Sequence, residues 1–151
     1  NSGYQVQSSI LDGWWLDTGS KESILEANQV MLKEFLVPQI SGAVDERSQI
    51  IGNVEIKEGS IVENSRIEGP TSIGEKCTIK NSSIGAFTSI GAKTTIGNSS
   101  LANSVLMERC SVTNVSHLFD SLIGSGVHLN CRPGSDSEMV LFVGDHARVE
   151  I

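Results

Sequence analysis

A 17-residue repeat constrains this chain more than any other feature of its sequence. Between Ile50 and Leu129, aliphatic residues recur in three columns at a nearly constant step. The first column is Ile50, Ile67, Ile84, Leu101 and Leu118; the second is Ile56, Ile73, Ile90, Met107 and, one residue short, Ile123; the third is Val62, Ile79, Ile96, Val112 and Leu129. A step of two hexads and one pentad predicts three short strands in each turn of a coil.

Residues between the columns agree with this interpretation. Glycine often follows the leading aliphatic residue, and a small or β-branched residue often stands four positions after it. Asn64, Asn81 and Asn98 form a further column at the same step. Because asparagine tolerates the left-handed backbone region better than most residues, we expect this column at a corner of the coil.

This hexapeptide pattern resembles that of the left-handed parallel β-helix found in sugar nucleotidyltransferases and acyltransferases. The resemblance implies a mainly β fold, preceded here by one α-helix. Five coils stacked at strand spacing would be roughly 24 Å long. An antiparallel β-sandwich is the alternative, but a sandwich gives no reason for a fixed step.

Composition and charge narrow the possible partners. The net charge is −7 with a pI near 4.9, which argues against nucleic acid or an anionic membrane surface. No run of 18 apolar residues is present, so no membrane span is expected. The three cysteines, Cys77, Cys110 and Cys131, have no metal-binding spacing. We therefore expect reduced thiols and a cytoplasmic protein.

One helix is predicted ahead of the repeat. Ser20 is a suitable N-cap, Glu22 lies in the first turn where negative charge is favoured, and Pro38 ends the helix near Leu36. Its apolar positions fall on one helical face: Ile24, Leu25, Met31, Leu32, Phe35 and Leu36.

Both ends of the chain resemble one enzyme family. The stretch Gly13-Trp14-Trp15-Leu16-Asp17-Thr18-Gly19, its following helix and the closing segment 139–151 are similar to parts of long-form glucose-1-phosphate thymidylyltransferases. The resemblance implies that residues 1–38 end a nucleotidyltransferase domain and that residues 39–151 form the β-helix domain. That family's glycine-rich nucleotide loop and its first metal-binding Asp are not in this sequence. We therefore expect the chain to be the C-terminal portion of a longer enzyme.

Asp17 is the candidate metal ligand. In the resembling family the Asp of this motif binds Mg²⁺, which takes carboxylate oxygens together with phosphates and water. The alternative role for Asp17 is to steady the start of the helix. In this chain alone we expect no bound metal, no cofactor-binding residues and no catalytic residues, because one carboxylate holds Mg²⁺ poorly.

His117 and His128 are the alternative catalytic residues. Some β-helix proteins use a histidine as the general base toward an acyl-CoA thioester. The only suggested orienting carboxylate is Asp120. A histidine on a coil surface is more often without such a role.

The resemblance implies a parent enzyme that makes dTDP-glucose from dTTP and glucose 1-phosphate, with the β-helix serving assembly or regulation. Two alternatives stand beside it: an acyl-CoA-dependent acetyltransferase of amino sugar phosphates, and a purely structural oligomerisation module. The expected partners are further copies of the chain in a homo-oligomer, with a trimer as one candidate, and a sugar phosphate and a nucleotide in the parent.

Overall fold

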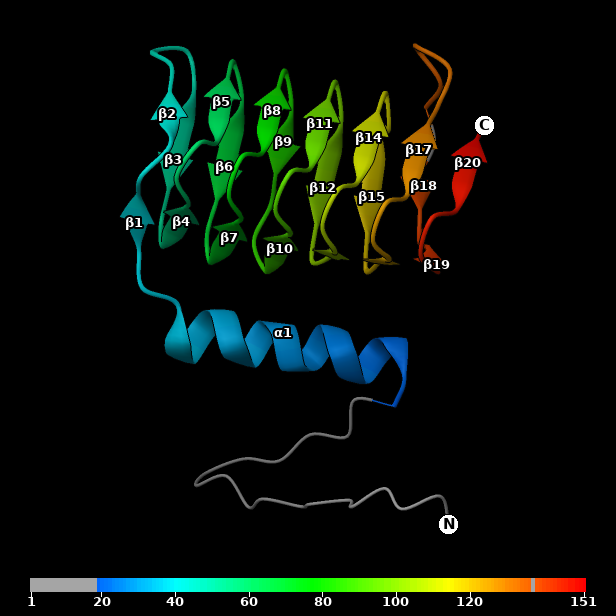
Figure 1. Cartoon of the computed structure of the whole chain (residues 1–151), viewed down its shortest axis with the longest axis horizontal. Helices are drawn as coiled ribbons and strands as arrows, with labels where there is room; N and C mark the ends of the chain where they lie inside the picture. The colour runs from blue at the N-terminus through cyan, green and yellow to red at the C-terminus, as the bar shows by residue number, and fades with distance from the viewer. Residues whose placement is uncertain (1–18, 137) are drawn as a thin grey trace.

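The computed structural model describes residues 19–136 and 138–151. These residues form one helix, α1 (Lys21–Phe35), followed by a mainly β, left-handed parallel β-helix of about seven turns. Figure 1 shows the coils stacked side by side, with α1 running along them. Fold class and helix position therefore agree with the sequence-based prediction.

Three parallel sheets form the sides of the coil. The first sheet contains β1 (Gln39–Ile40), β4 (Val54–Ile56), β7 (Thr71–Ile73), β10 (Thr88–Ile90), β13 (Val105–Leu106), β16 (Leu122–Ile123) and β19 (Phe142–Val143). The second contains β2 (Ala43–Val44), β5 (Ile61–Glu63), β8 (Thr78–Lys80), β11 (Thr95–Gly97), β14 (Ser111–Thr113), β17 (His128–Asn130) and β20 (Arg148–Glu150). The third contains β3 (Gln49–Ile51), β6 (Arg66–Glu68), β9 (Ser83–Ile84), β12 (Ser100–Ala102), β15 (His117–Phe119) and β18 (Glu138–Met139).

The predicted aliphatic columns form the core, with one correction. The fully buried side chains include Ile67, Ile84 and Leu118 from the first column and Val62, Ile79 and Ile96 from the third. In the second column, however, Ile90 pairs with Leu106, and Leu106 pairs with Ile123. Met107 is 42% exposed, so its prediction as a core residue was wrong. The turn shortens by one residue before Leu106, whereas the sequence columns placed that change after Met107.

The asparagine column lies at a corner, as predicted. Asn64, Asn81 and Asn98 have φ of 45°, 52° and 50°, and Asn114 continues the column with φ of 58°. All four occupy the corner between the second and third sheets. Left-handed backbone at this corner turns the chain sharply, and asparagine adopts it at lower cost than most residues.

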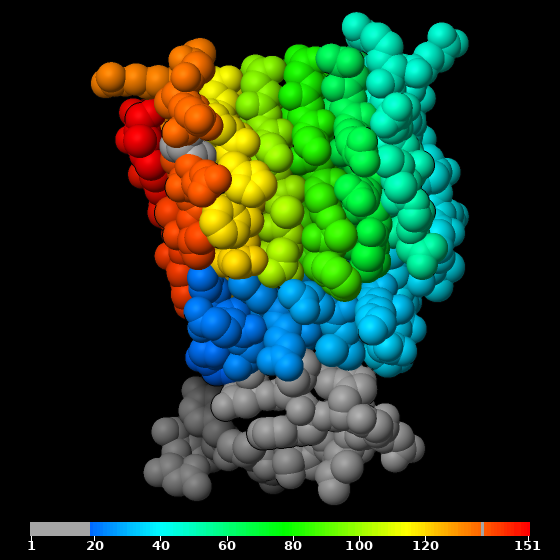
Figure 2. All heavy atoms as spheres, turned by 180° about the vertical axis from the view of Figure 1, so that it is seen from behind, coloured from blue at the N-terminus to red at the C-terminus, as the bar shows by residue number. Residues whose placement is uncertain are grey.

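The sixth turn carries an insertion at this same corner. The first column steps from Leu118 to Met139, which are register partners on β15 and β18, over 21 residues instead of 17. The added residues form a loop that begins at Cys131 and projects from the coil (Figures 1 and 2). The coil then completes a further turn, so residues 138–150 extend the three sheets. The insertion explains why the repeat is not visible in the sequence beyond Leu129.

Helix α1 begins and ends where the sequence predicts. The Ser20 side chain accepts a hydrogen bond from the backbone N–H of Ser23, and the helix ends at Phe35 with Leu36 as its C-cap. Figure 2 shows the helix along one edge of the stacked coils. Of the six apolar positions on the predicted helical face, Leu25 and Leu32 are buried, so the coil covers only part of that face. The edge of the coil contacts a stripe of α1 that is narrower than the apolar face of the helix.

Hydrogen bonds fix α1 to three successive turns, the middle one through the Gln29 amide, which donates to the Asn103 side-chain oxygen at 2.7 Å. The Asn28 side chain donates to the Phe87 carbonyl and accepts from the Ser89 hydroxyl. The Lys21 ammonium donates to the Asp120 carbonyl at 2.9 Å. These contacts hold the helix antiparallel to the direction in which the coils advance. Within the described residues, no helix is long and apolar enough to span a membrane.

Candidate functional site

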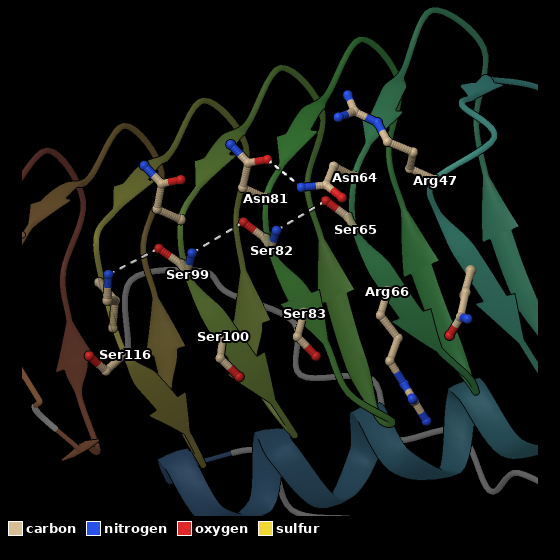
Figure 3. Close-up of a pocket in the computed structure, with 13 residues that line it drawn as sticks. Arg47, Asn64, Ser65, Arg66, Asn81, Ser82, Ser83, Ser99, Ser100 and Ser116 are labelled. Atoms are coloured by element: carbon tan, nitrogen blue, oxygen red, sulfur yellow. Dashed lines mark hydrogen bonds between the residues drawn. The ribbon is translucent and has the colours of Figure 1, made fainter. Parts of the chain in front are cut away.

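A polar groove of about 530 Å³ runs across the coils at the corner between the second and third sheets. Figure 3 shows side chains from successive turns lining it in parallel rows. The lining residues are Arg47, Gln49, Asn64, Ser65, Arg66, Asn81, Ser82, Ser83, Asn98, Ser99, Ser100, Val115 and Ser116. The rows arise because the repeat places the same residue type at the same position in each turn.

The inner row of the groove is a ladder of serine hydroxyls. Each buried hydroxyl accepts a hydrogen bond from the backbone N–H one turn later: Ser65 from Ser82 at 3.1 Å, and Ser82 from Ser99 at 3.2 Å. Each hydroxyl also donates to a carbonyl two residues earlier in its own turn. The ladder thus satisfies backbone groups that the corner removes from the sheets. Its role is to build the corner.

The outer row of the groove is a ladder of asparagine amides. The Asn64 amide donates to the Asn81 side-chain oxygen at 2.8 Å, and Asn98 donates to Asn114 at 3.3 Å. These side chains remain accessible at the groove edge, where each amide keeps further donor and acceptor capacity. The row can therefore hydrogen-bond to a polar ligand such as a sugar or an amide.

Charge is concentrated at the first turns of the groove. Arg47 lies 3.7 Å from the Asp45 carboxylate, and Arg66 lies 3.9 Å from the Glu68 carboxylate. These ion pairs are long and exposed, so they contribute little to stability. In Figure 3 the Arg47 side chain lies over the asparagine row while Arg66 lies lower on the third sheet. The two guanidinium groups therefore do not form a shared anion clamp.

Asp45 organises the entrance of the groove. The hydrogen bond from the Ser48 hydroxyl, at 2.6 Å, is the main cause that lowers the pKa of the Asp45 carboxyl. The backbone N–H of Asn64 and the nearby Arg47 lower that pKa further, against the opposing effect of burial. The ionised carboxylate thus caps the left-handed corner at Asn64. No carboxylate and no imidazole is among the lining residues, so the groove is suited to binding and lacks an acid or base.

The two candidate histidines lie on different sides of the coil. His117 is half-buried on β15, where its ring lies 5.1 Å from the Phe119 ring, and its register partner is Glu138. His128 is exposed on β17, between Ser111 and Arg148 in the register. The structure therefore does not bring these two histidines together.

Asp120 is held by α1 and its neighbours. Its carboxylate accepts a hydrogen bond from the Asn103 amide at 2.7 Å, and Asn103 accepts one from Gln29. Among the described residues no hydrogen bond or ion pair joins a carboxylate to either candidate histidine. The Asp120 carboxylate therefore contacts the side chain that binds α1, and it does not orient either candidate histidine.

A histidine that acts as a general base needs its imidazole ring held in a fixed orientation. His117 has an aromatic contact, and His128 faces the Arg148 strand, whose guanidinium pairs with Glu150 at 2.6 Å. Neither arrangement fixes a tautomer through a carboxylate. The described residues thus offer no complete acid–base pair at these histidines.

Two of the three cysteines belong to the corner ladders of the core. Cys77 and Cys110 are buried, and each thiol donates to a carbonyl of the next turn at 3.1 Å. Burial raises the pKa of both thiols, which keeps them protonated. These thiols occupy the position that serine or threonine occupies in other turns, as with Ser60. They are packing residues.

The predicted metal ligand, Asp17, lies outside the described residues. Within residues 19–136 and 138–151, no group of three or more His, Cys, Asp and Glu side chains could hold a metal ion. The polar groove and the contacts of α1 with Asn103 and Asp120 were not found from the sequence. The asparagine column was the one signal that pointed to the groove, and it was interpreted as corner geometry alone.

Comparison with known proteins finds similarity to nucleotidyltransferases. No family model matches it. It is 38% identical over 151 residues to a glucose-1-phosphate thymidylyltransferase of Streptomyces antibioticus and 37% identical over 151 residues to that of Streptomyces griseus. A low-salt glycan biosynthesis nucleotidyltransferase of Haloferax volcanii is 38% identical over 58 residues, which is 38% of this chain and 16% of that protein. The two Streptomyces alignments cover 100% of this chain but 42% of each relative, at its C-terminal end.

Proposed function

Because this chain is related over its whole length to the C-terminal portion of glucose-1-phosphate thymidylyltransferases, we propose that it is the β-helical part of such an enzyme. The whole enzyme would transfer a thymidylyl group from dTTP to glucose 1-phosphate and release pyrophosphate. The observation that carries this proposal is the match to two glucose-1-phosphate thymidylyltransferases over all 151 residues of the chain.

The β-helix serves assembly or regulation in this proposal. The described residues present a polar groove without an acid or base, and their two candidate histidines lack carboxylate partners. The coil is rigid because each turn is hydrogen-bonded to the next through three parallel sheets. A rigid prism with α1 fixed along it is suited to positioning other parts of the enzyme. The chemistry of the transfer would then reside mainly in the residues that this chain does not contain.

Asp17 is the residue of this chain that we propose for the reaction. When bound, Mg²⁺ would neutralise charge on the phosphates of the nucleotide. A carboxylate is a suitable ligand because Mg²⁺ prefers oxygen donors. Asp17 stands three residues before Ser20, the N-cap of α1, and α1 is fixed to the coil.

The test is an assay of pyrophosphate release in the full-length enzyme. Asp17→Asn is expected to keep the fold and to lower turnover severely, because it removes a charge from the metal's ligand set. The matched control is Asp136→Asn, which changes an exposed carboxyl on the inserted loop and should leave turnover unchanged. Near-normal turnover of Asp17→Asn across a Mg²⁺ titration would show that Asp17 only supports the start of the helix.

A further inference from the structure

Helix α1 carries two apolar stripes, of which the coil covers one. The first stripe is Leu25, Leu32 and Leu36; Leu25 and Leu32 are each 6% exposed against the coil. The second stripe is Ile24, Met31 and Phe35, each one residue earlier in the sequence. One residue rotates the helix by about 100°, so the second stripe lies on the flank of α1.

The second stripe is largely exposed to solvent. Met31 is 49% exposed and Phe35 is 58% exposed, while Ile24 is half-buried. The stripe spans 11 residue steps (35 − 24), or about 16 Å along the helix. An apolar stripe of this length on an amphipathic helix usually has a partner. The coil cannot be that partner, because hydrogen bonds from Lys21, Asn28 and Gln29 hold the helix in its present rotation.

We propose that the stripe of Ile24, Met31 and Phe35 is the docking surface for the portion of the enzyme that precedes α1. The inference rests on the match to the C-terminal portion of longer relatives, and not on the chemistry proposed for Asp17. In those relatives the match covers 42% of the length, so more than half of each protein lies ahead of it. Helix α1 is the described element that leads from that portion into the coil. Its flank is exposed along the helix, with Met31 and Phe35 in the last turns of α1.

This arrangement makes α1 a shared element of two bodies. One face is fixed to the coil by Leu25, Leu32 and the polar contacts, and the flank would be buried by the preceding portion. The orientation of the coil relative to that portion would then be set by a single rigid helix. A second copy of the chain and an unrelated protein are the other possible occupants, and the experiment below separates them.

The three methionines of the chain provide an internal probe. Peroxide converts an accessible methionine to its sulfoxide, and burial slows this reaction. Met31 on α1 and Met107 on the coil are 49% and 42% exposed, whereas Met139 is 7% exposed. In the 151-residue chain, Met31 and Met107 are expected to oxidise at similar rates and Met139 slowly. Mass spectrometry of peptides measures all three in one sample.

In the full-length enzyme, Met31 oxidation is expected to slow by about tenfold or more while Met107 keeps its rate. Phe35→Glu should restore fast oxidation of Met31 there, and the neighbouring Glu34→Gln should not. Equal Met31 rates in the chain and the full-length enzyme would overturn the proposal. Met31 could instead be protected from oxidation in the 151-residue chain, with protection that increases with protein concentration. That result would identify a second copy of the chain as the occupant and would also overturn the proposal. The readout needs no catalytic activity, so it is independent of the assay for thymidylyl transfer.

Discussion

Leu106 pairs with Ile90 in the first sheet and is 2% exposed, while the adjacent Met107 is 42% exposed. The turn between these two strands is therefore one residue shorter than its predecessors. Successive side chains of a strand point to opposite faces of the sheet. A register shift of one residue therefore exchanges the side chains that face the core with those that face solvent. Substitutions at the adjacent residues Leu106 and Met107 therefore test the register of this strand directly.

Leu106→Asp is expected to destabilise the chain by roughly 4 kcal/mol or more, because it buries an unpaired carboxylate among the aliphatic columns. Met107→Asp is the matched control and should change stability by about 0.5 kcal/mol or less. Denaturant unfolding followed by circular dichroism measures both. Equal losses for the two variants would contradict the register.

A pH dependence follows from Asp45. Its pKa is lowered below the ordinary value of 3.8, so the ionised form favours the folded state. That contribution is fully present above pH 3.8 and is lost as the pH falls through the lowered pKa. Asp45→Asn should therefore be less stable than the parent chain at neutral pH, and the difference should shrink in acid. Unfolding midpoints between neutral pH and pH 3 measure it, and a constant difference would refute the role of the ionised carboxylate.

We expect the chain to form a homo-oligomer, with a trimer as one candidate. Ile61 on the second sheet is 40% exposed and Phe142 on the last turn is 64% exposed. The strands of the first and last turns also present unpaired backbone edges, and such surfaces usually find a cover. Light scattering at micromolar concentration checks the state. A monomer under those conditions would count against the prediction.

We expect no acetyl transfer by the chain. His117 contacts Phe119 and His128 lies beside Arg148. In the part of the chain that the structure describes, no carboxylate is hydrogen-bonded to either ring. Incubation with acetyl-CoA and glucosamine 1-phosphate should release no thiol above background. Turnover that His117→Ala abolishes, while His128→Ala retains it, would instead establish the acetyltransferase alternative.

The sequence determined the coil because a periodic fold repeats one local environment. Ile67, Ile84 and Leu101 each meet the same neighbours one turn away, so a single column in the sequence describes a whole side of the core. The same argument located the corner at Asn81, where left-handed backbone favours asparagine. The helix from Lys21 to Phe35 was likewise predictable, since its cap and its terminating proline are local signals.

Tertiary structure decided everything that depends on where the period breaks or on contacts between distant segments. The choice of Leu106 over Met107 depends on packing against Ile90, because either residue is apolar enough for the column. The groove exists because Asn64 and Asn81, 17 residues apart in sequence, become adjacent rungs. The division of α1 into a covered and an uncovered stripe depends on its rotation, which Lys21 and Gln29 fix by reaching Asp120 and Asn103. A sequence period specifies which residues share a column, but only the folded chain specifies which surfaces the columns leave uncovered.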